Sequence, residues 1–154
     1  MKNKTCCFTG YRELSFWDSL ILSCKLKKEI KKLVGLGVIY FGNGGARDFD
    51  TIAAKAVLKM KKHYPDIHLI LVLPCAEHTS NWNSYDKEEF EYVKLHADKV
   101  KVLSNHYYSG CMHTRNRHLV DNSSYCICYK RKDFGDTAYT VNYAIKRILR
   151  IIEL

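Results

Sequence analysis

The chain has 154 residues, 47% of them hydrophobic and 27% charged, with 25 Lys and Arg against 16 Asp and Glu. Because no apolar run approaches the ~20 residues of a membrane span and no signal peptide is evident, we expect one cytoplasmic domain without a membrane partner. The net charge of +9 favours an anionic partner, but it does not distinguish a phosphate ligand from nucleic acid or from simple solubility.

Strand and helix patterns alternate along the whole chain. Lys4–Thr9 is a short apolar run that predicts a buried first strand, and Phe16–Leu33 has helical periodicity with lysines on its outer side. A strand over Val38–Phe41 and a helix over Phe49–His63 follow. The later segments are predicted as strand, helix, strand, helix, strand and helix, over Ile67–Leu73, Asp86–Ala97, Lys99–Leu103, Met112–Val120, Tyr125–Tyr129 and Thr137–Ile152.

This alternation predicts a single Rossmann-like α/β domain over residues 1–154. We expect a three-layer α/β/α sandwich around a mainly parallel five-stranded sheet, because strands that alternate with helices are joined by right-handed crossovers. Seven cysteines, an odd number, lie mostly in apolar runs and are expected to be reduced and buried. The Cys and His residues of the C-terminal half lack zinc spacing, so no metal is expected.

In open parallel sheets, ligands bind beyond the carboxyl ends of the strands, so the loops after the strands are the candidate site. The turn after the first strand contains Thr9, Gly10 and Arg12. Gly10 permits a tight turn, and Arg12 has a forked cation that suits phosphate or carboxylate. Taken alone, these residues are more typical of an ordinary turn with a solvated arginine than of a ligand-binding site.

The glycine-rich segment after the second strand is the most specific of these signals. It leads directly into a helix, whose free N–H groups and positive dipole end can hold a phosphate. Asp48 is a candidate N-cap, and Asp50 is a first-turn carboxylate or a ligand contact. The alternative is a flexible turn with a capping aspartate. The candidate ligand residues here are Gly42, Gly44, Gly45, Asp48 and Asp50.

Two further loops follow the fourth and fifth strands. Ser104–Thr114 is long for a compact domain, and the next two residues, Arg115 and Asn116, suit phosphate, ribose or base. Two exposed helical residues would look the same. The start of the last helix repeats a glycine turn, a polar side chain and a helix N-terminus, and its candidate residues are Gly135, Asp136, Thr137 and Thr140.

These segments form an ordered series. Cys7–Arg12 and Gly44–Ala54 are joined by shorter matches at Leu73–Cys75, Trp82, Ala97–Asp98, Tyr108, Cys111–Met112, Arg115–Arg117, Val120–Asp121 and Thr140–Val141. The series resembles the YpsA-like (DUF1273) branch of the SLOG superfamily, and it covers nearly the whole chain. SLOG domains are Rossmann-like and include the DNA-processing protein DprA and cytokinin-activating phosphoribohydrolases. The resemblance implies a pocket for a nucleotide or an ADP-ribose-like ligand.

Two departures from the family pattern bear on the ligand and on catalysis. The family usually has Gly-Gly-Thr where this chain has Gly135-Asp136-Thr137, and an acidic side chain there either repels a phosphate or bonds a ribose hydroxyl. The phosphoribohydrolases place a catalytic glutamate where this chain has Thr140, so hydrolysis by their mechanism is not expected.

The leading hypothesis is therefore a binding or sensing module for a nucleotide-derived small molecule, with no other cofactor. A second is an enzyme that cleaves an N-glycosidic bond, which would need a carboxylate such as Asp50, Glu77, Asp121 or Asp136. A third is DprA-like binding of single-stranded DNA, which the net charge favours and the helical spacing of the lysines does not. A homo-oligomer is compatible with each of these hypotheses.

Overall fold

The computed structural model describes residues 1–154, and each of the five predicted strands is present. The strands are β1 Thr5–Thr9, β2 Tyr40–Asn43, β3 His68–Leu73, β4 Lys99–Val102, β5 Tyr125–Cys128 and β6 Arg150–Glu153. The helices are α1 Phe16–Gly35, α2 Phe49–Lys61, α3 Ser84–His96, α4 Cys111–Asp121 and α5 Asp136–Lys146, and a 3-10 turn, Lys2–Lys4, precedes β1.

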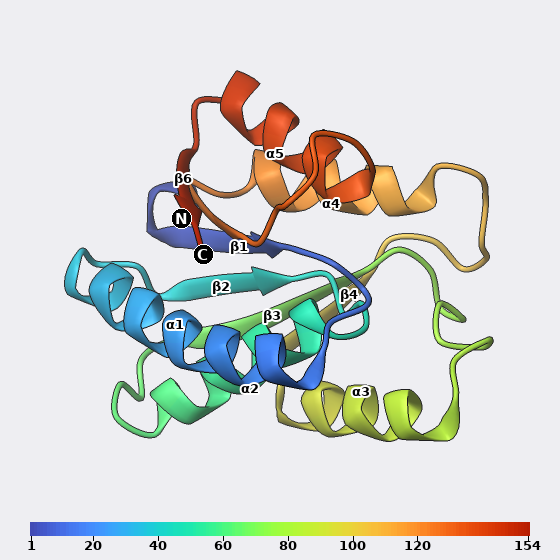
Figure 1. Cartoon of the computed structure of the whole chain (residues 1–154), viewed down its shortest axis with the longest axis horizontal. Helices are drawn as coiled ribbons and strands as arrows, with labels where there is room; N and C mark the ends of the chain where they lie inside the picture. Colours follow the sequence, from blue (N-terminus) through green and yellow to red (C-terminus); the bar gives the residue numbers. More distant parts are fainter.

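All six strands are parallel and lie in the order β4-β3-β2-β1-β5-β6. Helices α1, α2 and α3 cover one face of the sheet, and α4 and α5 cover the other (Figure 1). The predicted three-layer α/β/α architecture is thus confirmed. The strand order reverses at β1, which lies between β2 and β5. A crevice is expected at the carboxyl ends of β1 and β5, because the loops after these two strands lead to opposite faces.

Two hydrophobic cores fill the space between the layers. The larger core joins the sheet to α1, α2 and α3, and the smaller core joins it to α4 and α5. Because side chains alternate along a strand, Cys6 lies in the larger core and Cys7 in the smaller one. Six of the seven cysteines are buried and unpaired, as predicted, and Cys24 on α1 is exposed.

The prediction of one long final helix over Thr137–Ile152 is wrong in its second half. Helix α5 ends at Lys146, and the chain turns at Ile148, which has a left-handed φ of 63°. Residues Arg150–Glu153 then pair with β5 as a sixth strand. No glycine or proline marks this turn, and the apolar spacing continues through it, so helical periodicity masks the strand.

Candidate ligand site at the carboxyl edge of the sheet

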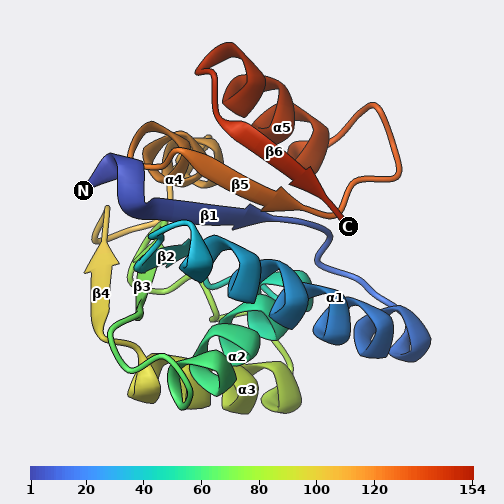
Figure 2. The same ribbon diagram turned by 90° about the vertical axis from the view of Figure 1, so that its left-hand side faces the viewer.

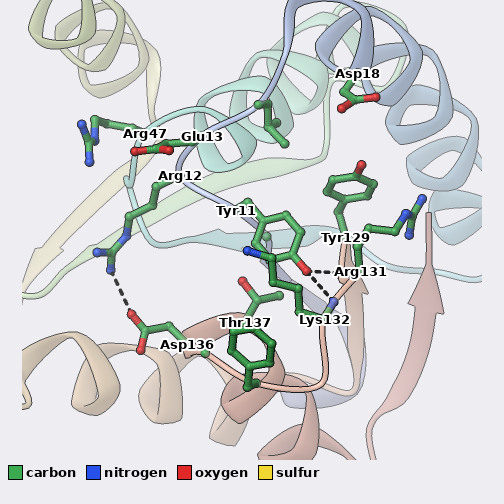
Figure 3. Close-up of a pocket in the computed structure, with 14 residues that line it drawn as sticks. Tyr11, Arg12, Glu13, Asp18, Arg47, Tyr129, Arg131, Lys132, Asp136 and Thr137 are labelled. Atoms are coloured by element: carbon green, nitrogen blue, oxygen red, sulfur yellow. Dashed lines mark hydrogen bonds and ion pairs between the residues drawn. The ribbon is translucent and has the colours of Figure 1, made fainter.

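A pocket of about 600 Å³ lies beyond the carboxyl ends of β1 and β5, where the strand order reverses. The loop after β1, the loop after β5 and the first turn of α5 form most of its walls (Figure 3). This volume is within the range of pockets that hold small molecules and cofactors. We refer to it below as the switch-point pocket.

Basic side chains outnumber acidic ones around the switch-point pocket. The lining cations come from three separate loops, and they are Arg12, Arg47, Arg131 and Lys132. The lining carboxylates are Glu13, Asp18 and Asp136. Such a lining favours an anionic ligand that also offers hydroxyl or amine groups to the carboxylates.

Aromatic rings form a second part of the lining. Tyr11, Tyr129 and Phe134 contribute rings, and the guanidinium of Arg131 lies 4.3 Å from the centroid of the Tyr129 ring. The hydroxyl oxygen of Tyr11 accepts hydrogen bonds from the backbone N–H groups of Arg131 and Lys132 (Figure 3). Tyr11 thereby ties the loop after β1 to the basic segment after β5.

One ion pair crosses the pocket. Arg12 from the loop after β1 points toward Asp136 at the start of α5, with 3.9 Å between guanidinium and carboxylate (Figure 3). The ring of His113 on α4 lies 3.4 Å from the same carboxylate. The Asp136 side chain is 58% exposed, so this pair is accessible and adds little to the free energy of unfolding. An incoming phosphate would compete with Asp136 for Arg12.

A smaller cavity of about 30 Å³ extends beneath the switch-point pocket and has Asp50 in its lining. The Asp50 carboxylate is 7% exposed and accepts a hydrogen bond from the N–H of Ala46. Burial raises the pKa of Asp50, while the nearby guanidiniums of Arg115 and Arg12 act in the opposite direction. Asp50 is thus a buried carboxylate with two guanidinium groups near it.

Arg115 belongs to a buried hydrogen-bond network. Its guanidinium donates to the carbonyl oxygen of Gly44, and its Nε donates to Oδ1 of Asn116 at 2.7 Å. Asn116 in turn donates from Nδ2 to the hydroxyl of Thr140 at 3.1 Å, which joins α4 to α5. Burial lowers the pKa of Arg115, and the carboxylate of Asp50 opposes that shift. This network fixes the positions of Arg115 and Asn116, which line the smaller cavity.

The glycine-rich segment after β2 is packed by the protein's own side chains. Gly45 has a φ of 67°, and a Cβ there would lie 2.6 Å from Cδ2 of Leu73. A Cβ on Gly44 would lie 2.8 Å from Cζ of Arg115. The carbonyl oxygen of Gly45 also lies 3.1 Å from Nε2 of His78. These contacts account for both glycines without a ligand.

Nine of the fourteen predicted ligand residues line the switch-point pocket or the cavity beneath it. They are Thr9, Gly10, Arg12, Asp50, Arg115, Asn116, Gly135, Asp136 and Thr137. The five that line neither are Gly42, Gly44, Gly45, Asp48 and Thr140. Asp48 is at the N-cap position of α2, but its carboxylate accepts the N–H of Leu14 at 2.7 Å and does not cap the helix. The expected capping role of Asp48 is therefore replaced by a contact that holds the loop after β1.

The prediction missed several residues of the pocket. Tyr11 and Arg47 lie next to predicted residues. Arg131 and Lys132 belong to the basic run Lys130–Lys132, which starts two residues after the end of β5. That run carried a usable signal, because it stands between a predicted strand and a glycine-led helix start. The contact of Tyr11 with the β5 loop spans about 120 residues of sequence and had no local signal.

Comparison with known proteins places this geometry in a family context. The profile of the YspA SLOG family matches residues 6–150. A UPF0398 protein of Ligilactobacillus salivarius is 27% identical over 141 residues, which cover 85% of this chain and 77% of that protein. The UPF0398 protein YpsA of Bacillus subtilis is 25% identical over 154 residues, which cover 94% of this chain and 86% of that protein.

Two solved structures share the fold. DNA processing protein A (DprA) of Streptococcus pneumoniae superposes with a TM-score of 0.72 at 16% identity, over 99% of this chain and 50% of that chain. DprA of Helicobacter pylori, described for its binding of single-stranded DNA, gives a TM-score of 0.68 at 18% identity, over 99% of this chain and 65% of that chain. This chain thus spans 50% of the first solved chain and 65% of the second. At these identities the likeness concerns the fold.

Proposed function

The chain belongs to the YspA SLOG family, and on that premise we propose that the switch-point pocket binds a nucleotide-derived small molecule. The observation that carries the proposal is the position of the pocket. It lies at the carboxyl ends of β1 and β5, where doubly wound sheets hold their ligands. The ligand class is a nucleotide or an ADP-ribose-like compound.

The lining of the pocket supports this class of ligand in each of its parts. Arg12, Arg131 and Lys132 supply cations for a phosphate, beside the N-terminus of α5 with its positive dipole end. Tyr11 and Tyr129 supply aromatic faces for a base. The carboxylates of Glu13 and Asp18 can accept hydrogen bonds from ribose hydroxyls. The lining of the pocket thus contains a complementary group for the phosphate, the sugar and the base of such a ligand.

A thermal-shift screen with ADP-ribose, cyclic ADP-ribose isomers, NAD and nucleotides tests the proposal. A ligand at one hundred times its Kd stabilises the folded protein by about 2.7 kcal/mol. For a chain of this size that gain raises Tm by about 5–10 °C. Arg12→Gln and Arg131→Gln should remove most of the shift, whereas Lys62→Gln, an exposed lysine just after α2, should keep it. A shift that all three variants retain would place the ligand elsewhere.

Single-stranded DNA is the second candidate ligand, because the DprA of Helicobacter pylori binds it and shares this fold. The basic segment Arg131–Lys132 is exposed at the rim of the pocket, where a strand could reach it. Fluorescence anisotropy with a labelled oligothymidylate over a salt series tests this candidate. Binding through phosphates weakens steeply as salt increases, by about 0.7 log units per log unit of salt for each contact.

Cleavage of an N-glycosidic bond stays a separate hypothesis. The positions of the four candidate carboxylates reduce the possible catalytic residues to two. Asp50 and Asp136 line the same small cavity. Asp121 instead pairs with Arg147, and Glu77 contacts the segment that contains His106. Incubation with nucleoside monophosphates and NAD, followed by chromatography for released base, tests the activity. Asp50→Asn and Asp136→Asn are the variants expected to abolish any release.

A further inference from the structure

The outer face of α1 exposes an apolar patch that the core does not use. Phe16, Trp17, Leu20 and Ile21 are 70%, 71%, 47% and 53% exposed, and we call these four residues the α1 patch. The buried side of the same helix is formed by Leu22, Leu26, Ile30 and Leu33. The N-terminal turns of α1 extend past the end of β1, away from the other helices (Figure 2). An exposed cluster of large apolar side chains marks an interaction surface.

The same face of α1 becomes strongly basic one turn beyond the patch. Trp17, Leu20 and Cys24 are followed at helical spacing by Lys28 and Lys31. Between residues 25 and 32 the helix has five lysines, and they are Lys25, Lys27, Lys28, Lys31 and Lys32. The only acidic residue in that stretch, Glu29, pairs with Lys32 at 3.3 Å. Four of the five lysines therefore have no carboxylate partner.

We propose that α1 attaches the protein to the surface of an anionic lipid bilayer. Trp17 and its apolar neighbours enter the headgroup region, and the lysines of the following turns lie over lipid phosphates. Trp and Phe suit this boundary because their rings are large and the indole N–H can stay hydrated. The proposed attachment is peripheral, because only the outer face of α1 takes part in it. None of the helices combines the length and hydrophobicity of a membrane span.

Charge complementarity favours an anionic bilayer over the other occupants of such a patch. Two copies paired in parallel along α1 would bring their lysine-rich halves close to one another, and like charges repel there. An antiparallel pair that buries the apolar patch would instead leave those lysines without an opposite charge. A bilayer that contains anionic lipid offers the opposite charge along the whole basic stretch. The proposal replaces the expectation from sequence that the protein has no membrane partner. It is independent of the proposed function, because none of the α1 patch residues lines the switch-point pocket.

Two intrinsic probes make the test direct. Cys24 is the one exposed cysteine and lies on the same face, so an environment-sensitive thiol dye reports contact with lipid. Trp82→Phe leaves Trp17 as the sole tryptophan, whose emission shifts to the blue in a bilayer interface. We expect co-sedimentation with vesicles of phosphatidylcholine and phosphatidylglycerol in equal parts, at least about tenfold stronger than with phosphatidylcholine alone, and weaker at high salt.

Matched variants test whether vesicle binding depends on α1 or only on the net positive charge of the protein. Trp17→Ser combined with Leu20→Ser, and the triple change Lys27→Gln, Lys28→Gln and Lys31→Gln, should each reduce vesicle binding about tenfold or more. The triple change Lys62→Gln, Lys99→Gln and Lys101→Gln removes the same charge elsewhere and should retain most of it. Equal losses in both triple variants, or no binding to anionic vesicles, would overturn the proposal. A dimer in size-exclusion chromatography that Trp17→Ser dissociates, with vesicle binding unchanged, would assign the patch to a second copy.

The nucleotide screen serves as the independent control. The α1 variants should keep any thermal shift that a nucleotide produces, and Arg12→Gln should keep vesicle binding. Failure of vesicle binding would thus not affect the proposed ligand site. Failure of nucleotide binding would likewise not affect the proposed attachment to a bilayer.

Discussion

The guanidinium of Arg115 lies against the backbone of Gly44 and donates a hydrogen bond to its carbonyl oxygen. The two residues are 71 positions apart, on α4 and on the loop after β2. A Cβ at Gly44 would lie 2.8 Å from Cζ of the arginine, which is itself 3% exposed and cannot move aside into solvent. Glycine at this position therefore makes room for a buried arginine of the protein itself.

This relationship predicts a non-additive pair of substitutions. Gly44→Ala should lower the free energy of unfolding by about 1–3 kcal/mol, because the added methyl group displaces the guanidinium from a packed site. Arg115→Ala should lower it by a similar or larger amount, because it leaves a buried carbonyl oxygen without its donor. In the double variant the methyl group no longer meets the arginine. Urea denaturation of the four proteins should give a coupling of about 0.5–3 kcal/mol, and strict additivity would contradict the contact.

Two residues with left-handed backbone predict changes of opposite sign. Ile148 has a φ of 63° and is 90% exposed, so its branched side chain is strained and buries almost nothing. Ile148→Gly should raise the free energy of unfolding by about 1 kcal/mol. Gly45→Ala should lower it by at least about 1 kcal/mol, because φ is 67° and Leu73 occupies the space of a Cβ. Urea denaturation checks both, and a destabilised Ile148→Gly would contradict the strain.

The buried ring of His78 predicts a loss of stability in acid. Burial lowers the pKa of His78 from 6.5 to about 4, although the hydrogen bond to the Gly45 carbonyl oxygen raises it. In the unfolded chain His78 is therefore protonated below about pH 6.5, whereas in the folded protein it stays neutral down to about pH 4. The free energy of unfolding should have its full value above pH 7, and it should fall by about 1–3 kcal/mol between pH 6.5 and 4.

Replacement of the histidine isolates this effect. His78→Gln should flatten the decline between pH 6.5 and 4 in urea denaturation, while His63→Gln, which changes an exposed ring, should leave it as steep as in the parent. Equal slopes for all three proteins would show that His78 is not kept neutral by its surroundings. Because the ring packs against Trp82 and Phe90 and hydrogen-bonds to the carbonyl oxygen of Gly45, we expect the loop after β2 to loosen first in acid.

The ion pair across the switch-point pocket predicts opposite effects on ligand affinity. Asp136→Asn removes the carboxylate that shares Arg12 and should tighten binding of ADP-ribose about 3- to 10-fold. Arg12→Gln should weaken it about tenfold or more, because a charge-assisted hydrogen bond is lost. Isothermal titration calorimetry measures both. The free energy of unfolding should stay within about 0.5 kcal/mol in either variant, because the pair is exposed. Weaker binding by Asp136→Asn would mean that the carboxylate holds a ribose hydroxyl.

Most of the fold was predictable from sequence because the five helices and the first five strands have strong local patterns. Ile67–Leu73 is nearly all apolar and forms β3 over His68–Leu73, and the regular alternation of strands and helices is enough to predict a parallel sheet. The sixth strand was not predictable in this way. Its residues continue the apolar spacing of α5, and only tertiary pairing with β5 fixes them as a strand.

The position of the candidate pocket was predictable from sequence, and the full set of residues that line it was not. The rule for strand ends located the pocket, and nine of the predicted residues line it or the cavity below. The inward direction of Arg115 depends on how α4 packs, which no local pattern contains. The same is true of Tyr11, whose hydroxyl reaches across to the backbone of the loop after β5.

The position of a bound nucleotide is the most direct test of the account. In an amide NMR titration with ADP-ribose, we predict that the largest shifts arise from Gly10, Arg12, Asp136 and Thr137, which line both the switch-point pocket and the cavity below it. Shifts that saturate while these four amides stay fixed, or that cluster at the amino ends of the strands, would contradict it.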